Sequence, residues 1–246
     1  MPDSLPFDRV ADCYDATRGG DERGHAFADV LQPWLAPGRT LEVGVGTGLV
    51  AGALRARGLD VYGIDLAPAM LARAYGRLGP RVAVGDARRL PVRAGSCDTV
   101  TFPASLHVIR DTAAALAEAV RVLRPGGRVV VMGATAVDPA DDELAPVLAG
   151  LPADDRADRP ATVATAAAAL GLRLVESREA HITELATSPN ALADDIEQRI
   201  WSQLWHVDGV VWSQVVVPVI DRLRALPDPD QPRERPMFMH LSVFDR

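Results

Sequence analysis

Short runs of β-branched and apolar residues alternate with segments rich in alanine, leucine and arginine between residues 39 and 132. The apolar runs have the length of strands and the intervening segments have the spacing of amphipathic helices. The runs predict strands at about 39–45, 60–64, 81–84, 97–102 and 127–132, and helices at about 48–57, 68–77 and 111–123. This alternation is typical of a parallel sheet with right-handed crossovers. Gly58 and Asp111 stand where a helix C-cap and a helix N-cap are expected.

The pattern continues less regularly after residue 132. Residues 133–160 are rich in Pro, Asp and Ala and predict a loop that contains a short helix. Ala161–Leu170 predicts a further helix, Leu172–Ser177 a sixth strand and Pro236–Phe244 a seventh strand.

About fifty residues, 186–235, lie between the last two predicted strands. Ala191–His206 predicts a helix with Trp201 and Trp205 on one face, and Val210–Leu226 predicts a second helix, which contains Trp212. Pro218 is expected to kink or restart this second helix. Two interpretations stay open: a packed helical pair that covers the sheet edge, or a lid that presents Trp201, Trp205 and Trp212 to a small apolar substrate.

The first predicted strand runs into three glycines at alternate positions, within Leu41–Gly48. Such a turn lets the backbone approach a ligand closely, and the helix start behind it offers free N–H groups. Asp65 ends the next strand, 21 residues after Gly44, where doubly wound proteins hold a nucleoside ribose. The spacing G-x-G-x-G differs from the G-x-G-x-x-G of dinucleotide-binding turns, and Glu42 inside the strand favours a ligand with positive charge.

The chain resembles the class I S-adenosylmethionine-dependent methyltransferases in five motifs that occur in order. These are Leu41–Gly48, Ile64–Leu71, Val84–Ala87 followed by Leu90-Pro91, Cys97–Phe102 and Leu123–Val131. The segment Phe7–Asp15 and Arg18 resemble the element before the core in the ubiquinone- and menaquinone-type branch. The resemblance implies an α/β fold: a Rossmann-like, doubly wound, mostly parallel sheet of seven strands. The last strand would be antiparallel between the fifth and sixth, and a helical lid would be added.

We therefore expect one methyltransferase domain over residues 1–246. Its parts would be a helical cap at 1–38, a core at 39–185, a lid insert at 186–235 and the last strand at 236–246.

The resemblance also implies which residues hold S-adenosyl-L-methionine. The methionyl part and the sugar would be wrapped by Gly44, Val45, Gly46, Thr47 and Gly48. Glu42 would help to hold the ammonium group, and Asp65 would accept from both ribose hydroxyls. The adenine would contact Leu66, Met70, Asp86 and the Ala87 N–H. The methyl and methionine end would be bordered by Phe102, Pro103, Tyr14 and Arg18.

A general base is harder to identify than the cofactor site. His107 follows the fourth strand at the edge that faces the cofactor, and a histidine titrates near neutral pH. His107 is the first candidate and His206, in the lid, the second; for His107 the alternative is a packed structural histidine. Asp138, Asp141 and Asp142 suggest a Mg²⁺ site, but Phe102-Pro103 occupies the place where a paired acid is needed, so no metal is expected.

The amino-acid composition limits the classes of molecule that this chain is expected to bind. The net charge is −7 and the chain has no lysine, which argues against a nucleic-acid partner. Arg88, Arg89 and Arg93 cluster, but Asp86 and Asp98 flank them, and we interpret the cluster as a solvated loop face. The two cysteines are isolated and no long apolar segment or signal sequence is evident, so we expect a soluble, cytoplasmic monomer or homodimer without membrane contact.

The expected reaction is methyl transfer to a small-molecule acceptor, with O or N favoured over C, which leaves S-adenosyl-L-homocysteine. The acceptor would be a secondary metabolite or a quinone-like precursor. Two alternatives come from other classes: an S-adenosylmethionine-binding protein with a non-methylating catalytic or regulatory role, and a nicotinamide-dependent oxidoreductase. The missing G-x-x-G spacing argues against the oxidoreductase.

Overall fold

The computed structural model describes residues 5–134, 143–152 and 157–246, which divide into two compact units. The first unit is built from residues 1–135, 156–182 and 239–246, and the second from residues 136–155 and 183–238. Each unit has a hydrophobic core of its own. That the whole chain is one domain stays a prediction.

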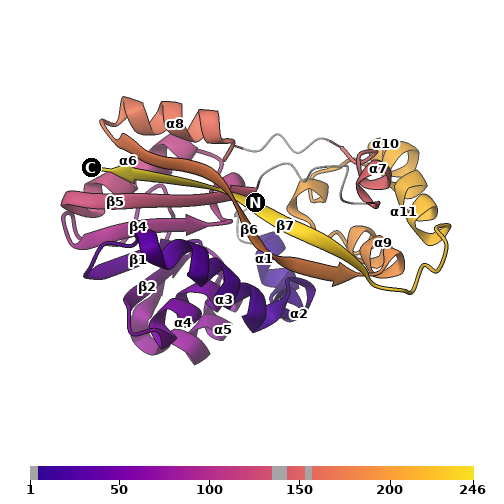
Figure 1. Cartoon of the computed structure of the whole chain (residues 1–246), viewed down its shortest axis with the longest axis horizontal. Coiled ribbons are helices and arrows are strands. Elements are labelled where there is room, and N and C mark those ends of the chain that lie inside the picture. Colours follow the sequence, from indigo (N-terminus) through magenta and orange to yellow (C-terminus); the bar gives the residue numbers. More distant parts are fainter. Residues whose placement is uncertain (1–4, 135–142, 153–156) are drawn as a thin grey trace. The chain divides into compact units, whose positions relative to one another are not determined.

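A seven-stranded sheet has the order β3-β2-β1-β4-β5-β7-β6 (Figure 1). The strands are β1 (Arg39–Val43), β2 (Asp60–Asp65), β3 (Val82–Val84), β4 (Cys97–Pro103), β5 (Leu123–Ala134), β6 (Arg173–Thr187) and β7 (Arg233–Asp245). The pairs β1–β2, β1–β4, β2–β3 and β4–β5 are parallel, whereas β7 is antiparallel to β5 and lies between β5 and β6. The predicted fold class and the place of the last strand are confirmed.

Helices cover both faces of this sheet. Successive strand residues point to opposite faces, and because the strands have apolar residues at successive positions, both faces carry apolar side chains that must be buried. The helices α3 (Gly20–Leu31), α4 (Leu49–Ala56) and α5 (Pro68–Leu78) lie on one face. The helices α6 (Thr112–Val122) and α8 (Pro160–Ala169) lie on the other, as Figure 1 shows. The largest core cluster packs α6 and α8 against the central strands, and its buried members include Val43, Phe102, Leu116 and Val131.

The helix ends follow the predicted caps. Gly58, with φ of 87°, comes directly after the last residues of α4. The carboxylate of Asp111 accepts a hydrogen bond from the Ala114 N–H at 2.9 Å at the start of α6. Two short helices, α1 (Leu5–Val10) and α2 (Tyr14–Thr17), precede α3.

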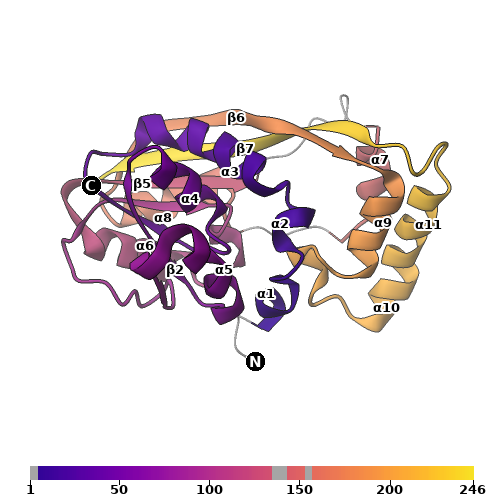
Figure 2. The ribbon, with the colours of Figure 1, turned by 90° about the horizontal axis from the view of Figure 1, so that it is seen from below.

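The second unit contains short helices. These are α7 (Ala145–Leu148), α9 (Pro189–Glu197), the 3-10 turn η5 (Ser202–Leu204), α10 (Gly209–Val211), the π-helical turn η6 (Trp212–Val216) and α11 (Val217–Arg224). Figure 2 shows α9 and α11 side by side. The core between them contains Leu192, Ile196, Val219 and Leu223, all buried.

The predicted helix over Ala191–His206 is wrong in its second half. Helix α9 ends at Glu197, and Arg199 has a φ of 54°, which an α-helix does not accommodate. Trp201 is extended and Trp205 follows η5, so the two do not share a helix face. The predicted effect of Pro218 is confirmed: it occupies the first turn of α11, directly after the π-helical turn.

Candidate cofactor site

Three glycines form the turn between β1 and α4, and each has a positive φ: 74° at Gly44, 56° at Gly46 and 80° at Gly48. A Cβ at Gly44 would collide with the side chain of Ser105. At Gly48 it would lie 3.2 Å from the Ala74 Cα, so this glycine lets α4 approach α5. A Cβ at Gly46 would have no heavy atom of the described residues within 4 Å. The absence of side chains therefore serves packing at Gly44 and Gly48, and leaves open space at Gly46.

Asp65, at the end of β2, is bonded to this turn. Its Oδ2 accepts from the Gly46 N–H at 2.7 Å and its Oδ1 accepts from the Ala67 N–H at 2.9 Å. Burial raises the pKa of the Asp65 carboxyl above its ordinary value, and these backbone hydrogen bonds oppose the rise. The structure thus brings together the acid and the glycine turn that sequence reasoning paired.

Glu42 is the last residue but one of β1 and has an exposed fraction of 2%. Its Oε2 has no hydrogen-bond partner among the described residues. Burial first, and the negative charge of Asp65 second, raise the pKa of Glu42 well above its ordinary value. A buried carboxyl group without a partner is costly, and a cationic ligand group would offset that cost. Glu42 and the open space at Gly46 fit the ammonium and the sugar of the expected cofactor.

The amino-terminal helix α2 is fastened to the glycine turn. The Thr47 hydroxyl donates to the Asp15 carboxylate at 2.5 Å. Arg77 of α5 donates to the other Asp15 oxygen at 2.9 Å and to the Thr47 carbonyl at 3.0 Å. Sequence reasoning missed Asp15 and Arg77 as a pair, because 62 residues separate them and no motif spacing links them.

Tyr14 and Arg18, predicted near the methionine end, pack within the amino-terminal segment. The Tyr14 ring meets the Phe7 ring edge-on at 6.5 Å between centroids. The Arg18 guanidinium lies 5.8 Å from the Tyr14 centroid. Met70, predicted at the adenine, is 1% exposed and packs in a cluster with Ala11 and Tyr14. It stays a prediction that these residues contact the cofactor. The same holds for Leu66, which is half-buried, and for Val45 of the glycine turn, which is buried.

Asp86 follows β3 and pairs with a neighbour two residues on. The Arg88 guanidinium donates to Asp86 Oδ2 at 2.6 Å, and the Arg88 backbone N–H donates to Oδ1 at 2.8 Å. This pairing lowers the pKa of the Asp86 carboxyl. An adenine bound by Asp86 and Ala87 would share the carboxylate with Arg88, a partner that sequence reasoning did not assign.

The end of β4 approaches the glycine turn. Phe102 is fully buried in the core under α6 and α8, and Pro103 is buried beside it. Ala104 has a φ of 53°, an uncommon conformation for a residue with a Cβ. The Ser105 hydroxyl then donates to the Val43 carbonyl at 2.6 Å, which joins this segment to β1. That Phe102 and Pro103 border the methyl group stays a prediction.

His107 lies in the short 3-10 turn η3 (Leu106–Val108) that follows β4. Its Nδ1 is 3.8 Å from Asp158 Oδ2, and the exposed side-chain fractions are 15% for His107 and 1% for Asp158. Sequence reasoning missed Asp158, since it stands in a segment interpreted as a loop without any motif. His206, the second candidate, is exposed in the second unit.

Two of the three predicted lid tryptophans, Trp205 and Trp212, contact Arg199 in the second unit. The Trp205 indole N–H donates to the Arg199 carbonyl at 2.8 Å, and the Arg199 guanidinium lies 4.0 Å from the Trp212 ring centroid. Trp201 and Trp212 pack against the core of this unit. These contacts support the packed interpretation, and contact with a substrate stays a prediction.

No group of three or more His, Cys, Asp or Glu in the described ranges could hold a metal ion. Asp138, Asp141 and Asp142 lie outside the described residues. Within the part of the chain that the structure describes, no helix is long and apolar enough to cross a membrane.

Comparison with known proteins agrees with the geometry. Residues 41–131 match the methyltransferase domain family. The demethylmenaquinone methyltransferase of Beutenbergia cavernae is 39% identical over 132 residues, which is 51% of this chain and 55% of that protein. The chain thus spans little more than half the length of the curated relatives it matches.

Two solved structures show the same fold at low sequence identity. A putative methyltransferase from Bacillus halodurans is 19% identical with a TM-score of 0.58, over 89% of this chain and 97% of that one. The cyclase SpnF is 18% identical with a TM-score of 0.59, over 98% and 94%.

Proposed function

We propose that this chain is a class I S-adenosylmethionine-dependent methyltransferase and that it transfers a methyl group to a small-molecule acceptor; the match of residues 41–131 to the methyltransferase domain family supports this. The observation that carries the proposal is buried Glu42, whose Oε2 has no hydrogen-bond partner among the described residues, beside the glycine turn and Asp65. These two carboxyl groups are hydrogen-bond acceptors, so they suit a ligand with a cationic end and a sugar, and they do not suit a diphosphate.

Each residue of the site has a distinct part in binding. Gly46 leaves space for the sugar, and Asp65 accepts from the ribose hydroxyls while it keeps its bond to the Gly46 N–H. Glu42 receives the ammonium group, directly or through water. Asp86 and the Ala87 N–H bind the adenine edge.

The bound cofactor supplies the sulfonium methyl group for an in-line displacement. The protein's own contribution is mainly to align the acceptor, since orientation accounts for roughly 7–11 kcal/mol of a barrier. A positioned base adds on the order of 10²–10⁴-fold. The geometry of the site therefore matters more than any single proton acceptor.

His107 is the proton acceptor that the structure supports best. Its imidazole stands after β4, and the buried Asp158 carboxylate 3.8 Å away would stabilise the imidazolium that forms. Methylation of a hydroxyl or amine releases a proton, which His107 would accept. We propose O or N rather than C as the acceptor atom; His107 does not decide this, because methylation of a ring carbon releases a proton as well.

The acceptor is a small molecule, either a quinone-like precursor or a secondary metabolite. This rests on the relatives that are demethylmenaquinone methyltransferases and on the net charge of −7, which disfavours nucleic acid. The chain is expected to act in the cytoplasm as a monomer or homodimer.

Binding of the cofactor is tested first, by isothermal titration calorimetry with S-adenosylmethionine, S-adenosylhomocysteine and NAD. We expect heat from the first two ligands and none from NAD. Binding of NAD alone would favour the oxidoreductase alternative and overturn the proposal.

Transfer is then tested with methyl-labelled S-adenosylmethionine and a metabolite extract or demethylmenaquinone analogues. Label in an organic acceptor supports methyl transfer. The fold also occurs in a cyclase, so cofactor binding without label in any acceptor would favour the non-methylating alternative.

The role of His107 is tested by His107→Gln and Asp158→Asn. We expect His107→Gln to lower kcat by on the order of 10²-fold or more, and Asp158→Asn to lower it less, with cofactor affinity unchanged in both. Equal kcat in the variants and the parent would show that alignment alone is enough.

A further inference from the structure

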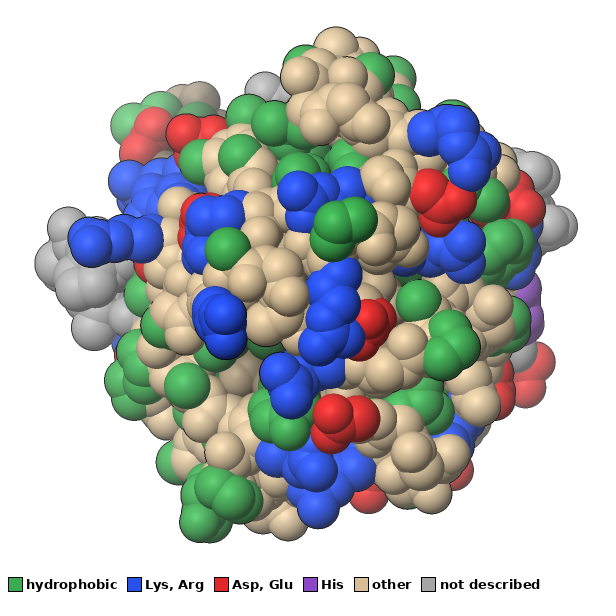
Figure 3. All heavy atoms as spheres, turned by 90° about the vertical axis from the view of Figure 1, so that its left-hand side faces the viewer, with side chains coloured by type: hydrophobic (Ala, Val, Ile, Leu, Met, Phe, Trp, Pro, Cys, Tyr) green, Lys and Arg blue, Asp and Glu red, His purple; other side chains and the backbone are tan. Residues whose placement is uncertain are grey.

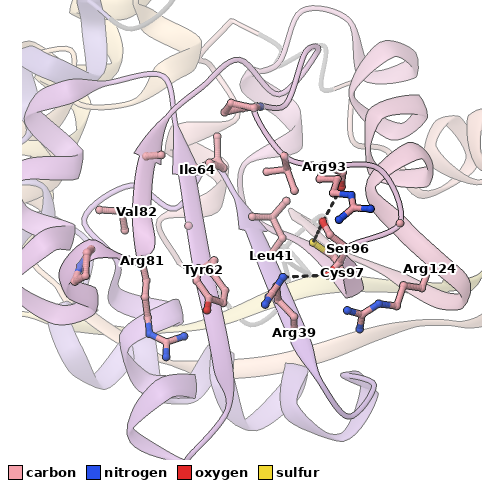
Figure 4. A pocket seen from close by; sticks show the side chains of 16 residues that line it. Arg39, Leu41, Tyr62, Ile64, Arg81, Val82, Arg93, Ser96, Cys97 and Arg124 are labelled. Carbon is pink, nitrogen blue, oxygen red and sulfur yellow. Dashed lines mark hydrogen bonds between the residues drawn. The ribbon is translucent and has the colours of Figure 1, made fainter.

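A cavity lies in the first unit, and its arginine residues are at the end of the sheet opposite to the glycine turn. It is an open groove of about 650 Å³ at the starts of β1 to β4, and Figure 4 shows it from close by. Arg39 and Val43 are the two ends of β1, about 13 Å apart at the usual rise per residue. Arg39 lines one end of the groove, and Val43 is followed by the glycine turn, so the arginine end of the groove is separate from the cofactor site. The other end of the groove reaches Ile64, the residue before Asp65.

The groove exists because the connection from β3 to β4, residues 85–96, contains no helix. It leaves an apolar floor on one face of the sheet, formed by side chains that are in register on neighbouring strands: Leu41, Tyr62, Ile64 and Ala83. The connection is held in place by α6: Arg121 donates to the Val92 carbonyl at 2.9 Å, and the Leu90 N–H donates to Glu118 at 2.7 Å. The wall of the groove is therefore preformed.

Arginines surround this floor. Four of them line the groove: Arg39, Arg81, Arg93 and Arg124. Figure 3 shows that arginine side chains gather on the end of the molecule that faces the viewer. Two carboxylates oppose them: Asp60 pairs with Arg39 and Arg81, and Asp98 pairs with Arg124 at 2.6 Å. The lining keeps an excess of positive charge on a chain whose net charge is −7.

Two of the guanidinium groups are held in fixed positions. Arg39 and Arg81 lie 5.2 and 4.8 Å from the centroid of the Tyr62 ring, and Figure 4 shows the ring between them. Arg93, predicted to be part of a solvated loop face, is exposed and lines the groove. Its guanidinium has no hydrogen bond or ion pair to another of the described residues, so it is available to a ligand.

We propose that this groove binds a small amphipathic anion, with a flat apolar body on the floor and a phosphate or carboxylate group at Arg93 and Arg124. Guanidinium groups recognise both anions through paired hydrogen bonds. The volume lies within the usual range of small-ligand sites, about 300–1,000 Å³. Cys97 also lines the groove, and burial raises the pKa of its thiol, so the ligand is held without a covalent bond.

The test uses three probes that share one aromatic body: naphthyl phosphate, naphthoate and naphthol. Calorimetry is carried out on the full chain with saturating S-adenosylhomocysteine, which occupies the proposed cofactor site. We expect heat from the phosphate, the carboxylate or both, and none from naphthol. The stronger of the two anions identifies the ligand group. Inorganic phosphate is expected to bind more weakly than naphthyl phosphate, since it lacks the apolar body.

Three variants locate the binding. Arg93→Ala is expected to weaken the tighter anion at least about threefold, the effect of removing one charge partner near a surface. Asp98→Asn removes a competing carboxylate and is expected to tighten it, which a merely destabilised variant would not do. Arg89→Ala, an exposed arginine outside the lining, is the matched control.

The proposal is overturned if neither anion binds, if naphthol binds as well as the anions, or if inorganic phosphate binds as well as naphthyl phosphate. It is also overturned if Arg93→Ala and Arg89→Ala have equal affinities, or if Asp98→Asn weakens binding. None of these outcomes bears on methyl transfer, because the arginine end of the groove is separate from the cofactor site and S-adenosylhomocysteine fills that site during the test.

Discussion

At the scale of single residues, the carboxyl groups of Glu42 in β1 and Asp65 at the end of β2 differ in their hydrogen bonds to the backbone. Asp65 is satisfied by the N–H groups of Gly46 and Ala67, whereas Glu42 Oε2 has no partner among the described residues. Both have a raised pKa, chiefly through burial. Carboxyl groups with a strongly raised pKa are common at functional sites, where a bound ligand supplies the missing hydrogen bond or charge.

Glu42→Gln is expected to change stability with pH in a defined direction. The folded-state pKa of Glu42 is raised above its unfolded value, so its contribution is most favourable at low pH and is lost as the pH rises through the folded pKa. The variant should therefore gain stability over the parent as the pH increases from about 4 to about 8. Urea unfolding at several pH values measures this. An equal difference at every pH would contradict the assigned burial.

Asp65→Ala is expected to weaken S-adenosylmethionine binding by roughly 1–3 kcal/mol, because buried polar partners are left unpaired. The same change leaves the Gly46 N–H without its acceptor. Calorimetry measures the affinity. Asp29→Ala, which removes an exposed acid on α3 that pairs with Arg57, serves as the control and should leave affinity unchanged. Unchanged affinity in Asp65→Ala would refute the ribose assignment.

At the scale of elements, short helices depend on tertiary contacts for their position. Helix α2 has four residues and no side-chain cap, so propensity alone does not hold it. The Asp15 carboxylate supplies the contact through Thr47 and Arg77. The same contact connects the amino-terminal segment to the glycine turn.

Asp15→Ala is expected to destabilise the protein by about 1–2 kcal/mol and to increase amide exchange over residues 5–17, since it removes partly buried hydrogen bonds. Asp12→Ala is a matched control: Asp12 also pairs with an α5 arginine, at 2.6 Å, but its side chain is 98% exposed. Its removal should cost at most about 0.5 kcal/mol. Equal effects would show that Asp15 is no more than a surface ion pair. Hydrogen exchange and urea unfolding measure both variants.

At the scale of the whole molecule, each unit has buried hydrophobic clusters of its own. Those of the first unit lie on both faces of the sheet, under α6 and α8 and under α3 to α5. The core of the second unit, the second core, lies between α9 and α11. All predicted cofactor-binding residues belong to the first unit, whereas His206 and the three predicted lid tryptophans belong to the second. Stability of the second core is therefore expected to be separable from cofactor binding.

Leu223→Ala removes a fully buried side chain of the second core and is expected to destabilise that unit by about 2–5 kcal/mol. Val217→Ala, on the same helix but 37% exposed, should change stability by about 0.5 kcal/mol or less. Both variants should keep their affinity for S-adenosylmethionine at temperatures where they are folded. A parallel loss of affinity in Leu223→Ala would contradict the separation. Thermal unfolding and calorimetry supply the two measurements.

The sequence by itself determined the alternating elements of the core, the glycine turn and the acid of β2. Their signals are local: strand and helix periodicity, Gly58 and Asp111 at helix ends, and glycines where the backbone needs a positive φ. The sequence did not predict that helix α9 ends at Glu197, because hydrogen bonds of Arg199 and Trp205 override helical propensity there.

Only the tertiary structure decided the contacts between distant residues. It brought Asp15 to Arg77, Asp158 to His107, and four arginines from separate segments to one groove. It also left Glu42 buried without a partner among the described residues. The physical reason is that periodicity fixes the face on which a side chain lies, whereas packing fixes which faces meet.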